Sequence, residues 1–113
     1  MKKILNKIKN VFNRSTENKI SYSEMKNIFN NNKNVYIIDV RSSQEYKEGY
    51  LQNAINIPEY ELKEKIGNFV KDKNSIIILY CQTEIRSLRG KKKLENLGYS
   101  NIYILRKGIE GLF

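Results

Sequence analysis

Short apolar runs along the chain predict a set of buried β-strands. The clearest runs cover residues 35–40, 76–80 and 102–105, and a shorter one at residues 54–57 is stopped by Pro58. Isoleucine is the commonest residue in three of the four and equals valine in residues 35–40. Strands that are apolar on both faces are typical of the interior of a parallel sheet. We therefore expect these four segments to lie side by side in one sheet.

Apolar residues at helical spacing separate the predicted strands. The spacing predicts helices over about residues 21–29, 42–48, 59–70 and 87–97. The first two begin with a serine three residues before a glutamate, which is the capping-box pattern. In the last helix we expect the leucines to point inward and Lys91, Lys92 and Lys93 mostly outward. Alternating strands and helices predict an α/β fold with a central, mainly parallel sheet, whose ligands bind beyond the carboxyl ends of the strands.

A basic amphipathic segment, residues 1–19, precedes the domain that we predict over residues 20–113. Its apolar residues share one helical stripe and are Ile4, Leu5, Ile8, Val11 and Phe12. We expect residues 1–14 to bind an anionic membrane surface or a protein partner, or else to pack on the domain or form a frayed tail. Lys7 and Lys9 interrupt the apolar stretch that a signal peptide requires, so we expect a cytoplasmic protein, peripheral at the membrane if bound there.

Composition narrows the chemistry that the chain can perform. Its 113 residues suit one domain, and 40% of them are hydrophobic. The chain has one cysteine and no histidine, which excludes an intramolecular disulfide, a Cys–His pair and a histidine-ligated metal. A single cysteine also suits a reducing cytosol.

The net charge of +9 is concentrated near the N-terminus. Residues 1–20 carry six basic residues and one acidic residue, which gives +5 of the total. The other basic cluster, Arg89 with residues 91–93, is better explained as the solvated face of a helix than as a nucleic-acid site. It lacks interleaved aromatic residues for stacking, which argues against a nucleic-acid partner.

Cys81 directly follows the most apolar of the predicted strands. A polar loop comes next, Arg86 lies five positions after the cysteine, and a helix is expected from about Ser87. Backbone N–H groups of such a loop can converge on an anion, and the helix dipole adds to their attraction. If that anion is the Cys81 sulfur, the amides and Arg86 favour a thiolate nucleophile that needs no histidine base. The alternative is that Cys81 is a small buried hydrophobic residue.

Several short motifs occur in an order and spacing that resemble the rhodanese-like domain family. They are Ile38-Asp39-Val40-Arg41, Glu45-Tyr46 with Gly49, Ala54-Ile55-Asn56-Ile57-Pro58, Tyr80-Cys81 with four residues before Arg86-Ser87, and Gly98-Tyr99 through Gly108-Ile109. The resemblance covers about residues 20–113. It implies a parallel sheet flanked by helices. It also implies a cysteine that accepts a sulfane sulfur, holds it as a persulfide and passes it to a nucleophilic acceptor.

The resemblance implies roles for individual residues as well. Cys81 is the expected nucleophile, and Asp39 and Arg41 are expected to support the site. Arg86 is expected to lie near the transferring sulfur or to brace the loop. The loop whose amides hold the sulfur consists of Gln82, Thr83, Glu84, Ile85, Arg86 and Ser87. The expected partners are a small or protein-borne persulfide donor and a thiol acceptor, with no cofactor and no metal.

The length of the loop distinguishes between two activities of this architecture. Four residues separate Cys81 from Arg86, whereas phosphatases of similar architecture have one more. The shorter loop favours sulfur transfer over hydrolysis of a phosphate ester.

The main departure from the family pattern is Glu84, where active sulfurtransferases usually have glycine. If the position requires a positive φ, Glu84 strains the loop. Its carboxylate would also repel the thiolate and the thiosulfate dianion, so we expect a persulfide to be the better donor. Tyr50 and Phe113 stand where histidine and tryptophan are common. The alternative function is a rhodanese-like module with weak or no turnover that recognises a protein partner.

Overall fold

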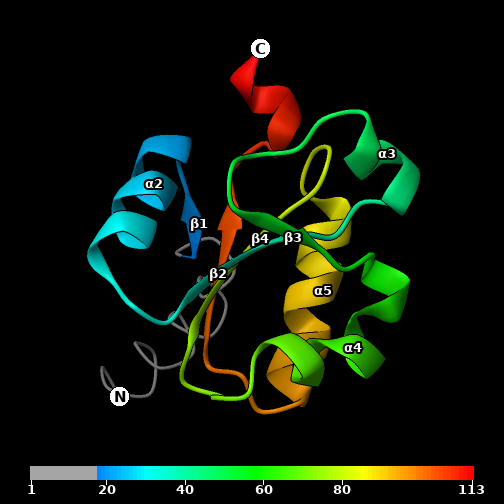
Figure 1. Cartoon of the computed structure of the whole chain (residues 1–113). Coiled ribbons are helices and arrows are strands. Elements are labelled where there is room, and N and C mark those ends of the chain that lie inside the picture. The colour runs from blue at the N-terminus through cyan, green and yellow to red at the C-terminus, as the bar shows by residue number, and fades with distance from the viewer. Residues whose placement is uncertain (1–17) are drawn as a thin grey trace, which may run out of the picture.

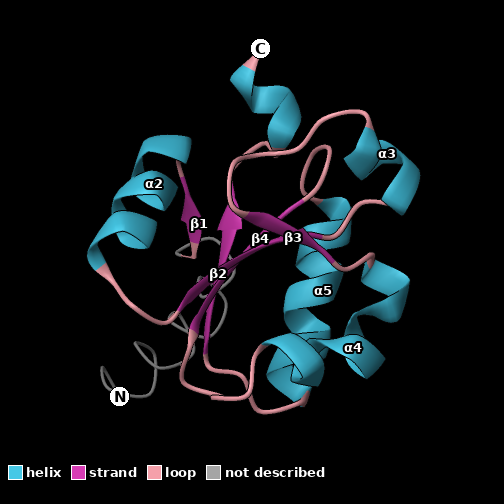
Figure 2. Ribbon diagram, viewed as in Figure 1, coloured by secondary structure: helices cyan, strands magenta, loops and turns pink. Residues whose placement is uncertain are grey.

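The computed structural model describes residues 18–113 of the chain, in which a parallel sheet is covered by helices on both faces (Figures 1 and 2). The predicted amphipathic helix within residues 1–14 lies outside the described residues. The strands are β1 (Lys19–Ile20), β2 (Val35–Asp39), β3 (Ala54–Asn56), β4 (Ile76–Tyr80) and β5 (Asn101–Leu105). Their order in the sheet is β1-β5-β4-β2-β3, and every pairing is parallel. The α/β prediction is confirmed.

The connections between the strands are helical. The α-helices are α2 (Tyr22–Asn31), α3 (Ser43–Lys47), α4 (Leu62–Phe69) and α5 (Ile85–Asn96), and two short 3₁₀ helices are η1 (Glu59–Glu61) and η2 (Ile109–Leu112). Both predicted capping boxes are present, with Ser21 and Glu24 bonded reciprocally at α2 and Ser42 and Glu45 at α3. Such reciprocal bonds fix where a short helix begins, because they satisfy two of its free backbone N–H groups.

The alternation of side chains along the central strands divides the core into two layers. Ile37 and Ile78 belong to the layer beneath α2, and Ile38 and Leu79 to the layer beneath α4 and α5. All four side chains are buried. Because both faces of the central strands are covered, β4 and the part of β2 before Asp39 are apolar, which explains the runs seen in the sequence.

The structure differs from the sequence-based predictions in three places. The strand β1 was not expected, and its two residues pair with the end of β5. The segment predicted as one helix from residue 59 is the 3₁₀ helix η1 followed by α4 from Leu62. Lys91 was expected to point outward, but its side chain is 3% exposed and pairs with Glu95 one turn along α5. Within residues 18–113 no helix is long and apolar enough to cross a bilayer.

Candidate functional site

Cys81 and the residues after it lie at the carboxyl edge of the sheet. Cys81 follows β4, which is the middle strand between β5 and β2. We call residues 82–87 the cysteine loop. The helix α5 begins at Ile85, two residues earlier than predicted, so that residues 85–87 form its first turn. The connection between strand and helix is therefore short and tight.

The first carbonyl groups of this segment are bonded to the C-terminal part of the chain. The Ile109 N–H donates to the carbonyl oxygen of Cys81, and the Glu110 N–H donates to that of Gln82, both at 3.0 Å. The segment that contains η2 is thereby fixed against the outer side of the cysteine loop.

Gly108 makes this close approach possible. Its φ is 61°, which favours glycine, and a Cβ atom here would overlap the carbonyl oxygens of residues 81–83. Three consecutive carbonyl groups thus face the same glycine. No other residue type fits this position without moving the loop.

The N–H groups of the cysteine loop face the opposite way. A trans peptide directs its N–H away from its C=O, so the N–H groups of residues 82–84 point away from Gly108. Those of residues 85–87 are the unpaired donors that every helix has in its first turn. Within the described part of the chain, none of these six groups donates to a backbone or side-chain acceptor. Converging free N–H groups at the start of a helix form an anion-binding arrangement.

Arg86 is held by a residue that the sequence analysis assigned only to a helix cap. Its Nη1 and Nη2 donate to the two carboxylate oxygens of Glu45 at 2.6 Å and 3.0 Å. These bonds from Arg86 hold the pKa of Glu45 at about 2. Arg86 is therefore tied to α3 by this ion pair, and its role toward the transferring sulfur stays a prediction.

Asp39 and Arg41 form a buried ion pair beside the loop. Their side chains are joined at 2.7 Å, and Asp39 is 0% exposed. The Arg41 guanidinium also donates to the Gly49 carbonyl oxygen at 2.7 Å. Asn56 donates to the backbone oxygens of both Asp39 and Arg41. The pair ties β2 to the segment that follows α3.

Cys81 itself is 1% exposed and belongs to the aliphatic core layer beneath α4 and α5. This burial is what the alternative interpretation, a small hydrophobic residue, requires. A donor can reach the thiol only if part of its surroundings moves. The Ser87 hydroxyl, also buried, has no hydrogen-bond partner among residues 18–113. An unpaired buried hydroxyl costs about 1–3 kcal/mol, so a bound anion that accepts its hydrogen bond would be stabilised.

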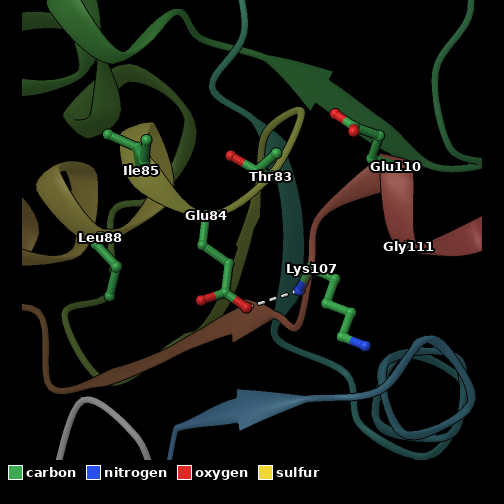
Figure 3. Close-up of a pocket in the computed structure, with 7 residues that line it drawn as sticks. All are labelled: Thr83, Glu84, Ile85, Leu88, Lys107, Glu110 and Gly111. Carbon is green, nitrogen blue, oxygen red and sulfur yellow. Dashed lines mark hydrogen bonds between the residues drawn. The ribbon is translucent and has the colours of Figure 1, made fainter.

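Glu84 does not behave as the sequence suggested. Its φ is −140°, so the expectation of positive-φ strain is wrong. The carboxylate pairs with Lys19 Nζ at 2.7 Å and accepts from the Lys107 N–H at 2.7 Å (Figure 3). Partial burial raises the pKa of Glu84, but these two bonds lower it more, so it stays below its ordinary value. The negative charge is matched by Lys19, which weakens the expected repulsion of an anionic donor.

Two surface cavities flank the cysteine loop and share no lining residue. The first, about 500 Å³, lies on the Glu84 side and is lined by Thr83, Glu84, Ile85, Leu88, Lys107, Glu110 and Gly111 (Figure 3). The second, about 460 Å³, lies on the Gln82 side and is lined by Arg41, Glu45, Glu48, Gly49, Tyr50, Leu51, Gln82, Ile109 and Phe113. We call the second the Gln82 pocket. Its lining includes Gln82, which follows Cys81, together with Arg41 of the buried ion pair and Glu45, which holds Arg86. We take this pocket as the candidate approach to the site.

No metal centre is found among residues 18–113, where no three His, Cys, Asp or Glu side chains gather. The predicted site residues lie at the carboxyl ends of two paired strands: Asp39 ends β2 with Arg41 two residues later, and Cys81 with residues 82–87 follows β4. The role of Glu45 beyond its helix cap was not predicted. The partner, Arg86, is 41 positions away in the chain, and no local pattern reports such a contact.

Comparisons with known proteins agree with this geometry. The model of the family described as "Rhodanese-like domain" matches residues 21–112. Thiosulfate sulfurtransferase PspE of Escherichia coli (strain K12) is 40% identical over 65 residues, which are 58% of this chain and 62% of that protein. A tRNA uridine(34) hydroxylase of Buchnera aphidicola subsp. Baizongia pistaciae is 37% identical over 82 residues, 69% of this chain and 26% of that protein. Both matches span less than two thirds of the relative's length.

A solved structure, a rhodanese with anions from E. coli, superposes with a TM-score of 0.63 at 36% identity. The superposition covers 67% of this chain and 88% of that one.

Proposed function

The chain belongs to the rhodanese-like domain family, and from that premise we propose that it is a sulfurtransferase that carries a sulfane sulfur on Cys81. One relative is named a thiosulfate sulfurtransferase.

The proposed reaction has two displacements at sulfur. The Cys81 thiolate attacks the terminal sulfur of a persulfide R–S–SH, so that the new S–S bond on Cys81 forms as the donor's S–S bond breaks, and the thiolate RS⁻ leaves. With thiosulfate as donor, sulfite leaves instead. An acceptor thiolate then attacks the outer sulfur and releases the Cys81 thiolate. Each step conserves electrons, so that no external oxidant or reductant is required.

The observation that carries the proposal is the set of six N–H groups in the cysteine loop that have no acceptor within residues 18–113. Together with the first-turn dipole of α5, they stabilise negative charge on Cys81, first as the thiolate and then as the persulfide anion. Arg86 lies in the same loop, but because its charge is paired with Glu45 it adds less to this stabilisation than the amides do. The unpaired Ser87 hydroxyl is a further donor available to that charge.

The preferred donor is a persulfide, although Glu84 is not the main reason. In the Gln82 pocket, Arg41 is paired with Asp39, and Arg86 beside it is paired with Glu45. The remaining charged group in the lining is the exposed Glu48. A doubly charged donor such as thiosulfate therefore meets no unpaired cation among the lining residues. A neutral or singly charged persulfide is less affected.

A second candidate function is supported by the burial of Cys81. A thiol that is 1% exposed within an aliphatic layer is also what a rhodanese-like binding module without turnover would show. In that case the surface around the loop recognises a protein partner and the cysteine is part of the core.

A turnover assay separates the two candidates. The chain is incubated with thiosulfate or with glutathione persulfide, and with cyanide as acceptor, and thiocyanate is measured. The proposal expects catalysis that is lost in Cys81→Ser and is faster with the persulfide. Equal rates in native protein and Cys81→Ser with every donor would support the binding module.

The cellular location of the protein is a separate proposal, which rests on the basic N-terminal sequence. We propose a cytoplasmic protein whose residues 1–14 contact an anionic membrane or a protein partner. Co-sedimentation of the intact chain with phosphatidylserine vesicles, compared with a chain that starts at Lys19, tests the membrane contact. Equal sedimentation of the two would contradict it.

A further inference from the structure

An exposed aromatic residue, Tyr50, lines the Gln82 pocket. Its ring stacks on the ring of Tyr46, with centroids 4.1 Å apart and an angle of 13° between the planes. Tyr46 does not line the pocket, so it supports Tyr50 from the far side. With one face covered, Tyr50 is still 55% exposed. The exposed face of its ring is therefore the one available to a ligand.

The backbone on both sides of Tyr50 is fixed by buried side chains. The Gly49 carbonyl oxygen accepts from the Arg41 guanidinium at 2.7 Å, and the Leu51 N–H donates to the Tyr80 hydroxyl at 2.9 Å. Arg41 and Tyr80 are 5% and 0% exposed, respectively. The supporting ring of Tyr46 is fixed as well, since its hydroxyl donates to the Ala54 carbonyl oxygen at 2.8 Å. Tyr50 is thus a preorganised surface, and a ligand that stacks on it pays little for ordering it.

The size and lining of the Gln82 pocket suit an organic molecule better than an inorganic anion. Its volume of about 460 Å³ lies in the range of small-molecule sites, roughly 300–1,000 Å³. Apolar side chains of Leu51, Ile109 and Phe113 complete the wall beside Tyr50. In Figure 1 the segment after α3, which carries Leu51, and the C-terminal η2, which begins at Ile109, lie at the same end of the sheet. Thiosulfate would leave most of this space to water.

We propose that Tyr50 is the docking platform for an aromatic ring that carries the sulfur, so that the preferred donor or acceptor is an aryl or arylmethyl persulfide or thiol. This inference rests on the proposed sulfur transfer and narrows its substrate class. The ring stacks on the free face of Tyr50. Gln82 of the cysteine loop lines the same pocket, so the sulfur of a ring docked on Tyr50 can be directed toward that loop. Offset stacking of two rings is worth about 0.5–1.5 kcal/mol beyond the area that it buries.

A binding experiment tests the platform without requiring turnover. Benzyl methyl sulfide, an unreactive thioether, is titrated into the full chain and followed by amide NMR, with dimethyl sulfide as the ligand without a ring. We expect shifts at residues 49–51 and 109 with the benzyl compound alone. Tyr50→Ala should weaken its binding about fivefold, and Tyr50→Phe should keep it within about twofold.

The matched control is Tyr60→Ala, because Tyr60 is an exposed tyrosine that lies outside the pocket lining. It should bind the benzyl compound as the native chain does. Equal shifts with both sulfides, or equal affinities of the native chain and Tyr50→Ala, would overturn the proposal.

A kinetic comparison connects the platform to the reaction. With benzyl persulfide as donor, Tyr50→Ala should raise KM about fivefold with little change in kcat, and the rise in KM should be smaller with thiosulfate, which has no ring to stack. An equal loss with both donors would mean that Tyr50 acts only through the fold. If neither donor supports turnover in the native chain, the proposed function fails, and the titration with benzyl methyl sulfide still decides whether the platform exists.

Discussion

Glu45 holds Arg86 with both of its carboxylate oxygens, at 2.6 Å and 3.0 Å, while one of those oxygens also accepts from the Ser42 N–H that begins α3. The Glu45 side chain therefore completes the capping box of α3 and also positions the Arg86 guanidinium in the cysteine loop. Through this contact the short helix α3, which buries no residue completely, contributes to the site.

The first prediction concerns the acid stability that this contact provides. The folded pKa of Glu45 is about 2, below its ordinary value of 4.5, so the contribution is complete above about pH 4.5 and is lost as the pH falls toward 2. Because the pair is about one-third exposed, we expect Glu45→Gln to lower the free energy of unfolding at pH 7 by only about 1 kcal/mol. The difference from native protein should shrink below pH 4.5, as measured by urea unfolding.

Glu61→Gln is the matched control, because it removes an exposed ion pair, with Lys65 one helical turn away, that does not involve the cysteine loop. It should change stability by less than about 0.5 kcal/mol at any pH. A pH-independent loss in Glu45→Gln would show that the cap, and not the charge pair, is affected.

The second prediction concerns the buried pair of Asp39 and Arg41. Asp39→Asn leaves the guanidinium of Arg41, 5% exposed, without its counter-charge. We expect a loss of about 3–5 kcal/mol in the free energy of unfolding. The double variant Asp39→Asn/Arg41→Met should lose less than the sum of the single variants, because no charge remains buried. Additive losses in urea unfolding would contradict the coupling.

The third prediction uses two glycines with opposite surroundings. Gly108→Ala places a Cβ onto the carbonyl oxygens of residues 81–83 at a φ of 61°, and we expect a loss of at least about 2 kcal/mol. Gly67→Ala, within α4 and with no atom near the new Cβ, should stabilise the chain by about 0.5–1 kcal/mol. Thermal unfolding measures both, and a harmless Gly108→Ala would mean that the loop is not held as described.

The fourth prediction concerns the charge of Glu84. Glu84→Gln keeps an acceptor for the Lys107 N–H and removes the charge that Lys19 now balances. We expect thiosulfate:cyanide activity to change by less than about twofold. A tenfold rise, about 1.4 kcal/mol of transition-state stabilisation, would show that the Glu84 carboxylate does repel thiosulfate. Glu84→Gly also removes the side-chain acceptor of the Lys107 N–H, which joins the cysteine loop to the segment before η2. With the loop less restrained, this variant should show faster alkylation of Cys81 by neutral iodoacetamide.

Much of the fold follows from local patterns in the sequence. Runs such as residues 76–80 identify central strands because both of their faces are buried. Ser21 and Ser42 locate two helix starts because a capping box is complete within four residues. The position of Cys81 between a buried strand and a helix was equally local. These features need no knowledge of the rest of the chain.

Other features depend on contacts that no local pattern records. The strand β1 has two residues, and only its pairing with β5 makes it a strand. Glu84 looked harmful because its partners, Lys19 and the Lys107 N–H, come from distant segments. Lys91 is buried although its neighbours suggest an exposed face, and its pair with Glu95 one turn along α5 satisfies the ammonium group without by itself predicting the burial.

The most direct test of the account is the mass of the intact chain after incubation with an excess of glutathione persulfide. We predict a gain equal to one sulfur atom, its disappearance when a thiol acceptor is added, and no gain in Cys81→Ser. An unchanged mass of the native chain, under conditions in which iodoacetamide shows Cys81 to be reachable, would contradict the claim that this cysteine carries sulfur.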